Sequence, residues 1–296
     1  MTLPTHEPVM VTELVEVLMP ARGGLYVDCT VGLGGHSRAL LEAGATRVLG
    51  LDRDPDALRI AEARLEEFGD RVELVHADYR DLGRVLDARR IAAVSGAVAD
   101  LGVSSMQLQA EGRGFSFRRD EPLDMRMDRS QGPTASDRLA DATEQELADV
   151  IFQYGEERYS RRIARALVES RHGGPIVTTG QLADLVRRAV PRRGYQRIDP
   201  ATRTFQALRI WVNRELERLD RFLEEACARL LVGARLAVIT FHSLEDRIVK
   251  HTFRALAKGA LALGIVTKRP LVPAPAEVDR NPRARSAKLR AIERLA

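Results

Sequence analysis

The sequence predicts an α/β fold built on a Rossmann-like parallel sheet, and two features of its first hundred residues support this. Short apolar runs typical of strands alternate with runs typical of helices, as expected for a parallel sheet covered by helices. A glycine-rich turn follows the first strand, and the second strand ends on an acid, Asp52. The expected elements are strands over Tyr26–Cys29, Val48–Asp52, Val72–His76 and within Ile91–Leu101, with helices near Ser37–Ala43 and over Pro55–Phe68.

The turn after the first strand has the features of a nucleotide site. Residues 28–37 read D-C-T-V-G-L-G-G-H-S. Glycines such as Gly34 and Gly35 let a ligand approach the backbone, and the N-terminus of the following helix attracts an anionic group. Asp52 is placed to accept hydrogen bonds from ribose hydroxyls. The alternative is a turn that only packs the helix on the strand.

The residues around this turn favour S-adenosyl-L-methionine over a dinucleotide. The dinucleotide fingerprint needs a third glycine where this chain has Ser37. The acids Asp28 and Asp100 suit a ligand with a positive centre and no pyrophosphate. The sulfonium and ammonium groups of S-adenosyl-L-methionine are cationic, and its one carboxylate can use the helix N-terminus.

Ligands of an open parallel sheet bind at the C-terminal ends of the strands, and this rule adds further candidates. Tyr79 either stacks on the adenine or packs in the core. His36 either contacts the amino-acid end of the ligand or caps the helix. His242 follows a fifth strand and either orients a group at the site or hydrogen-bonds a backbone carbonyl. Asp54 is a better helix cap than Asp52.

The pattern changes after Gly102, where a glycine-, arginine- and aspartate-rich stretch precedes helices without intervening strands. Thr143 with Glu146 three residues later predicts a capping box at the start of one of them. The expected elements are helices over Ala142–Tyr154, Arg158–Ser170 and Thr179–Ala189, a basic loop at Arg192–Tyr195, a long helix over Thr204–Leu231, a strand over Ala234–Phe241 and a helix over His242–Lys258. We therefore expect a discontinuous Rossmann-like domain, 1–104 with 204–296, and an inserted α-helical domain over 105–203.

Composition sets broad limits. The chain has 296 residues, 45% of them hydrophobic, which suffices for a sizeable core. Its net charge of +4 and pI of about 9.3 permit a nucleic-acid partner without requiring one. Cys29 and Cys227 have no partner spacing, so neither a disulfide nor a metal site is expected. No stretch has signal-peptide or transmembrane length, which favours a soluble cytoplasmic protein with no membrane partner.

Several longer motifs are specific enough to compare with a known protein family. Besides the glycine turn and L-D-R-D-P (51–55), they are H-E-P-V (6–9), A-D-L-G-V-S-S-M-Q-L (99–108), G-R-G-F-S-F (112–117), P-L-D-M-R-M-D (122–128), Y-G-E-E-R (154–158), P-A-T-R-T-F-Q-A-L-R-I (200–210), F-H-S-L-E-D-R-I-V-K (241–250) and R-S-A-K-L-R (285–290). On these motifs nearly the whole chain closely resembles the bacterial 16S rRNA (cytosine-N(4))-methyltransferase family known as RsmH or MraW. It departs at Asp199, where the family usually carries His.

The resemblance implies a class I S-adenosyl-L-methionine-dependent methyltransferase sheet. It also implies methyl transfer to the exocyclic 4-amino group of a specific cytidine in 16S rRNA of the small ribosomal subunit, with the helical insertion helping to bind the RNA. The residues it implies at the cofactor are Gly34, Gly35, His36, Asp52, Tyr79, Asp100 and Gln107. The sequence leaves a homodimer open.

The acceptor amine is a poor nucleophile, because its lone pair is delocalised into the ring. Groups that accept hydrogen bonds from its N–H groups would make it more reactive. The candidates for this positioning are Asp100, Ser104, Ser105 and His242. Phe115 and Phe117 either stack on a base or anchor the insertion. The nearest alternative is a Rossmann methyltransferase acting on another nucleic-acid base or a small-molecule amine. A dehydrogenase and an RNA-binding factor without turnover are more distant ones.

Overall fold

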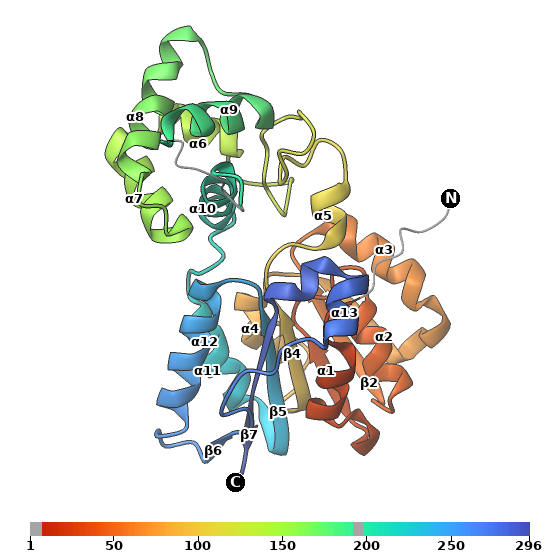
Figure 1. Cartoon of the computed structure of the whole chain (residues 1–296). Coiled ribbons are helices and arrows are strands. Elements are labelled where there is room, and N and C mark those ends of the chain that lie inside the picture. Colours follow the sequence, from red (N-terminus) through yellow and green to blue (C-terminus); the bar gives the residue numbers. More distant parts are fainter. Residues whose placement is uncertain (1–7, 192–197) are drawn as a thin grey trace. The chain divides into compact units, whose positions relative to one another are not determined.

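The computed structural model describes residues 8–191 and 198–296, so the basic loop expected at Arg192–Tyr195 lies outside the described residues. The chain divides into two compact units (Figure 1). One consists of Met1–Ser104 with Leu216–Ala296, and the other of Ser105–Glu215. The second boundary thus falls after Glu215, whereas we expected it after residue 203.

The first unit is built on a seven-stranded sheet in the order β3-β2-β1-β4-β5-β7-β6. The first five of these strands are parallel neighbours, and β7 runs antiparallel to both β5 and β6. The strands are β1 Leu25–Asp28, β2 Arg47–Asp52, β3 Val72–His76, β4 Val94–Asp100, β5 Leu230–Thr240, β6 Leu263–Ile265 and β7 Lys288–Arg294. This arrangement confirms the predicted Rossmann-like α/β class.

Helices cover the sheet on both faces. Those of the first unit are α1 Val11–Leu18, α2 Gly35–Glu42, α3 Pro55–Leu65, α4 Leu82–Ala88, α11 Leu219–Ala228, α12 Ser243–Leu256 and α13 Pro275–Arg280, with short 3₁₀ segments η1 Pro20–Arg22, η2 Glu66–Arg71, η3 Tyr79–Asp81 and η5 Pro282–Ser286. Figure 1 shows α11 and α12 on one side of the sheet and α1 and α2 on the other. Asp54 caps α3 by accepting a hydrogen bond from the N–H of Asp56, as predicted.

Strand β5 shows why the run from residue 236 to 239 is continuously apolar. Leu236 and Val238 pack in the core on the α11 and α12 side, while Ala237 and Ile239 pack in the core on the α1 and α2 side. Successive side chains of a strand point to opposite faces, so a strand covered on both faces needs apolar residues at every position. Sequence analysis did not predict α1, β6 or β7.

The prediction of one long helix over Thr204–Leu231 is wrong. The structure has α10 over Ala201–Asn213 and α11 over Leu219–Ala228, because Arg214 and Arg218 adopt left-handed backbone conformations with φ of 53° and 58°. This break places α10 in the second unit and α11 in the first.

The second unit is helical. Its helices are α5 Ser105–Gln109, α6 Ala135–Asp141, α7 Glu144–Gly155, α8 Ser160–Ser170, α9 Thr179–Ala189 and α10, with the 3₁₀ segment η4 Arg171–Gly173. The capping box of Thr143 and Glu146 is confirmed at the start of α7. A second capping box, Thr134 with Asp137, begins α6, which sequence analysis did not predict.

Two of the sequence motifs hold each other in the second unit. The N–H of Met125 donates to the carbonyl of Arg113 at 2.9 Å, and the buried Arg113 guanidinium donates to the carbonyl of Met127 at 2.9 Å. Phe115 is buried, and Phe117 packs edge-on against Phe205 with ring centroids 4.8 Å apart. These contacts favour the anchoring role for both phenylalanines over base stacking.

Gly155, the last residue of α7, is expected to resist substitution. A Cβ on Gly155 would lie 2.6 Å from the backbone carbonyl oxygen of Arg203 in α10, and a backbone atom cannot swing aside. Gly155→Ala should therefore destabilise the protein by about 1–3 kcal/mol, although Gly→Ala within a helix is ordinarily stabilising. Gly173→Ala, where a Cβ meets nothing within 4 Å, is the matched control. Equal urea midpoints for the two variants would contradict this packing account.

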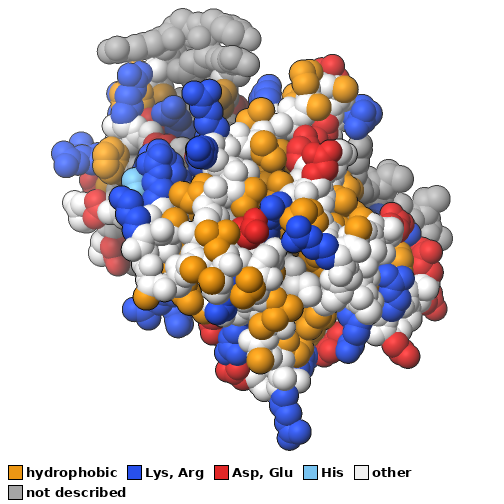
Figure 2. Space-filling model, turned by 90° about the horizontal axis from the view of Figure 1, so that it is seen from below, with side chains coloured by type: hydrophobic (Ala, Val, Ile, Leu, Met, Phe, Trp, Pro, Cys, Tyr) orange, Lys and Arg blue, Asp and Glu red, His pale blue; other side chains and the backbone are white. Residues whose placement is uncertain are grey.

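Among the described residues, no helix is long and apolar enough to cross a membrane. Figure 2 shows basic, acidic and apolar side chains interspersed on the face that it draws.

Candidate active site

The sheet order places a candidate site at the carboxyl ends of β1 and β4. From β1 the chain continues to β2 and β3 on one side, and β4 and β5 lie on the other side. In open α/β sheets, ligands bind outside the carboxyl ends of the strands at the point where the order reverses. Strand β1 ends at Asp28 and β4 at Asp100, while the neighbouring β2 ends at Asp52. Three carboxyl groups therefore end adjacent strands.

Asp52 is half-buried and is oriented by the backbone on both sides. Its Oδ2 accepts a hydrogen bond from the N–H of Gly32 at 2.7 Å, and its Oδ1 accepts one from the N–H of Asp54 at 2.8 Å. Burial raises the pKa of Asp52 to about 6, despite these two hydrogen bonds, which lower it. Asp52 is therefore fixed in orientation, and each oxygen keeps lone-pair capacity for a ligand hydroxyl.

Asp28 is fully buried and held by its neighbours in the turn. The Ser37 hydroxyl donates to Asp28 Oδ2 at 2.7 Å, and the N–H of Thr30 donates to Oδ1 at 3.2 Å. Burial raises the pKa of Asp28, and the His36 ring and the Ser37 hydroxyl lower it. Ser37, which stands where a dinucleotide site would need glycine, thus has its own role in holding this carboxyl group.

Asp100 and His36 form a close pair beneath the turn. Oδ2 of Asp100 lies 3.7 Å from Nδ1 of His36, whose Nε2 lies 2.9 Å from the carbonyl oxygen of Val9. Burial raises the pKa of Asp100 to about 7, which the His36 ring lowers and the carboxyl groups of Asp28 and Glu245 raise further. Oδ1 of Asp100 is buried and has no hydrogen-bond partner within the described parts of the chain.

Backbone conformation requires glycine at Gly34, and packing requires it at Gly35. Gly34 has a φ of 83°, in the left-handed region, and begins α2 as its N-cap. A Cβ on Gly35 would lie 2.8 Å from the ring of Pro8, so the N-terminal segment packs directly on this glycine. Capping of α2 by His36 is wrong, because Gly34 holds the cap position and His36 lies inside the helix. Around Gly32, by contrast, a Cβ would meet only the carbonyl oxygen of Thr30, at 3.9 Å.

Tyr79 is buried at the start of η3, in the core on the α11 side. Its ring centroid lies 4.7 Å from that of Phe222, and the two planes are tilted by 59°. These contacts are those of a packing residue. Stacking of Tyr79 on an adenine stays a prediction.

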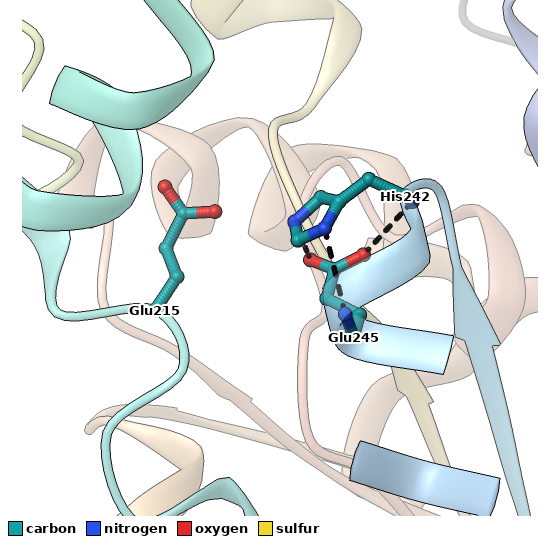
Figure 3. A group of neighbouring side chains, drawn as sticks. All are labelled: Glu215, His242 and Glu245. Carbon is teal, nitrogen blue, oxygen red and sulfur yellow. Dashed lines mark hydrogen bonds and ion pairs between the residues drawn. The ribbon is translucent and has the colours of Figure 1, made fainter. Parts of the chain in front are cut away.

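His242 caps α12, and its partner is Glu245, which sequence analysis did not select (Figure 3). The N–H of Glu245 faces Nδ1 of His242 at 3.4 Å, and Nε2 of the ring lies 3.1 Å from Oε1 of Glu245. Oε2 of the buried Glu245 accepts a hydrogen bond from the N–H of Phe241 at 2.9 Å. The ring therefore contacts a carboxyl group rather than the backbone carbonyl considered above. The H-S-L-E spacing was the available signal, because an acid three residues after a cap closes a capping box.

The remaining candidates belong to the junction and to the second unit. Ser104 is half-buried at the end of the first unit, and the side chain of Ser105 lies outside the described residues. Gln107 is buried on α5 of the second unit. Asp199 pairs with Arg187 at 2.9 Å within that unit, which gives the departure at this position a structural role. Glu215, which is also drawn in Figure 3, forms an ion pair with Arg209 of the second unit.

The residues at the carboxyl ends of the strands fit S-adenosyl-L-methionine. Asp52 is oriented to accept hydrogen bonds from ribose hydroxyls, and Asp100 supplies a buried carboxylate oxygen that has no partner among residues 8–191 and 198–296. Buried polar atoms are normally satisfied, so an unsatisfied carboxylate at a switch point indicates a cationic or hydrogen-bonding ligand. The anionic pyrophosphate of a dinucleotide would meet Asp28 and Asp100 unfavourably.

Comparison with known proteins agrees with this chemistry. A family model described as the MraW methylase family matches residues 4–295. A protein of Nitrobacter winogradskyi named Ribosomal RNA small subunit methyltransferase H is 51% identical, over 98% of this chain and 90% of its own length. Proteins of the same name from Trichlorobacter lovleyi and Thermotoga neapolitana are 50% and 51% identical, over 98% and 97% of this chain and 98% and 95% of their own lengths.

Solved structures are more distant. An rRNA methylase from Streptococcus thermophilus has a TM-score of 0.43 and 14% identity, over 97% of this chain and 94% of its own. A putative methyltransferase from Streptococcus mutans in complex with SAH has a TM-score of 0.43 and 12% identity, over 98% of this chain and 100% of its own. The assignment rests on the family model and the close relatives instead. The chain belongs to the MraW methylase family, a family of S-adenosyl-L-methionine-dependent methyltransferases.

Proposed function

We propose that this protein transfers a methyl group from S-adenosyl-L-methionine to the exocyclic 4-amino group of a specific cytidine in 16S rRNA of the small ribosomal subunit. One observation supports the proposal most strongly. Over 98% of its length the chain is 50–51% identical to proteins named as methyltransferases of small-subunit ribosomal RNA. The choice of the cytosine 4-amino group rests on the motif resemblance, chiefly P-A-T-R-T-F-Q-A-L-R-I and F-H-S-L-E-D-R-I-V-K.

In this proposal the first unit holds the methyl donor. Asp52 binds the ribose, Gly34, Gly35 and His36 shape the turn beside the amino-acid part, and Tyr79 borders the adenine. Asp100 provides the negative charge nearest to the cationic centre. When bound, the donor supplies a methyl group on a positively charged sulfur, so the protein contributes mainly proximity and alignment. Gln107 and the helical second unit contribute to cofactor and RNA binding, respectively.

The lone pair of the acceptor amine must turn from the ring toward the methyl carbon. Groups that accept hydrogen bonds from its two N–H groups would favour this change. Asp100 is the strongest candidate, because it combines a buried oxygen that has no partner in the described part of the chain with a pKa of about 7, near neutral pH. Ser104 and Ser105 are proposed to position the base. His242 is tied to Glu245, so its proposed contribution is to shape the end of β5 rather than to accept a proton. The target base must leave its stack to reach the site.

An acceptor comparison tests the proposal. The protein is incubated with methyl-labelled donor and, separately, with small subunits from a strain lacking the activity, with naked 16S rRNA and with DNA. Label should enter 16S rRNA in at least one of the two RNA arms and should be absent when small subunits from a strain with the activity are used. Label confined to DNA, or no transfer to either RNA acceptor, would refute the proposed acceptor.

A further inference from the structure

The Asp100–His36–Val9 chain of contacts assigns His36 a role beyond cofactor contact. His36 is buried in the first turn of α2, and its Nε2 lies 2.9 Å from the carbonyl oxygen of Val9. A carbonyl oxygen only accepts hydrogen bonds, so Nε2 must carry the proton in this contact. Nδ1 faces Oδ2 of Asp100 at 3.7 Å. It attracts that carboxylate only when it also carries a proton, because an unprotonated Nδ1 and a carboxylate oxygen are both acceptors.

Asp100 is held at two points around this contact, and one of its oxygens is left over. Its backbone N–H donates to the Thr30 hydroxyl at 2.6 Å, its Oδ2 faces His36, and its Oδ1 is buried with no partner among the described residues. The titratable groups that influence it are His36 of α2, Asp28 of β1 and Glu245 of α12. Two of these three are acids, so the His36 ring is the one that favours the carboxylate form.

We propose that His36 is a positioning residue for methyl transfer: the Val9 carbonyl fixes its ring, and the ring orients Asp100 so that Oδ1 receives the proton released by the acceptor amine. This inference rests on the proposed function. The amine nitrogen forms a bond to the methyl carbon, and the carbon–sulfur bond breaks with its electron pair passing to sulfur. One N–H proton then passes to Asp100. The positive charge lost from sulfur is balanced by the neutralisation of the carboxylate.

The arrangement explains a pKa that favours proton exchange near neutrality. Burial and the two neighbouring acids raise the pKa of Asp100 to about 7, while His36 opposes them. Without the ring, the pKa of Asp100 would rise further, and the carboxylate fraction at neutral pH would fall. The acid limb of a kcat–pH profile reports such a group in the bound complex.

Two variants separate the two contacts of the ring. His36→Gln places an amide near the position of Nε2, so it can keep the Val9 contact while losing the group that faces Asp100. His36→Asn places an amide near Nδ1, so it can donate to Asp100 while losing the Val9 contact. We expect His36→Gln to move the acid limb of kcat to higher pH, with kcat at pH 6.5 about tenfold below wild type, because a pKa change of one corresponds to tenfold. His36→Asn should keep the limb near its wild-type position.

The opposite pattern, a wild-type limb in His36→Gln and a shifted limb in His36→Asn, would show that the ring only clasps the N-terminal segment. Unchanged limbs in both variants would equally overturn the inference. Nitrogen NMR of the labelled histidines in the ligand-free protein at pH 6.5, assigned by the signal lost in His36→Gln, should show protons on both ring nitrogens of His36, and a neutral ring with an unprotonated Nδ1 would contradict the arrangement. The NMR result does not depend on turnover, so an inactive wild-type protein with both ring nitrogens protonated would count against the proposed function alone.

Discussion

Asp52→Ala is expected to weaken binding of S-adenosyl-L-methionine more than any other single change in the first unit. The carboxylate is oriented by the N–H groups of Gly32 and Asp54, and both of its oxygens can accept a ribose hydroxyl. Hydrogen bonds to a charged group contribute about 1.5–3 kcal/mol each, so losing two predicts a rise in Kd of at least about 100-fold. Calorimetric titration of the purified protein measures this directly.

The control for this prediction is Asp56→Ala. Asp56 lies in the first turn of α3 and pairs with the exposed Arg59, so its removal should change Kd by less than about threefold. Both variants should keep the wild-type circular dichroism spectrum. An Asp52→Ala protein that is folded and binds the donor with wild-type affinity would remove Asp52 from the site.

Asp100→Asn is expected to lower kcat by about 100-fold or more, the ordinary contribution of a positioned proton acceptor. The wild-type protein should also bind the donor more tightly as pH rises through about 7, because Asp100 is neutral below its pKa and anionic above it. Below that pKa the affinity should fall by up to about tenfold for each pH unit. In Asp100→Asn this step in the Kd–pH profile should disappear.

The same carboxyl group should reduce stability at high pH. The pKa of Asp100 is raised from 3.8 to about 7 in the folded protein. The protonated carboxyl group therefore stabilises the fold fully at pH values below 3.8, and this stability is lost as pH rises through about 7. Asp100→Asn should therefore raise the melting temperature of the ligand-free protein at pH 8 relative to wild type, and less so at pH 5. A melting temperature that falls equally at both pH values would show that Asp100 supports the fold instead.

The parallel strands of the sheet could be predicted from the sequence, but the antiparallel strand β7 and the edge strand β6 beside it could not. Strand β3 has the bounds expected from its apolar run, and the turn after β1 was expected from its glycines. Strands β6 and β7 were missed because their pairing is with each other and with β5, far along the chain, and neither follows an alternation of strand and helix. The break between α10 and α11 depends on two arginines in left-handed conformations, which arginine does not ordinarily favour.

The candidate site shows the same division. Asp52 and Asp100 could be chosen because strand ends are visible in the sequence. The partner of His36 could not, because Val9 approaches from 27 residues away, and the partner of Asp28 was hidden because Ser37 was considered only as a missing glycine. Glu245 was missed because His242 was considered as a site residue and not as a helix cap, so the acid three residues later was not recognised as its partner.

The identity of the methylated nucleoside tests the central claim most directly. After reaction of small subunits with methyl-labelled donor, 16S rRNA is digested to nucleosides, and the labelled species is identified by chromatography and tandem mass spectrometry against standards. We predict a single labelled nucleoside, cytidine carrying the methyl group on its 4-amino nitrogen, and its loss with Asp100→Asn. Label on a ring carbon, on a ribose hydroxyl or on a nucleoside other than cytidine would contradict the account.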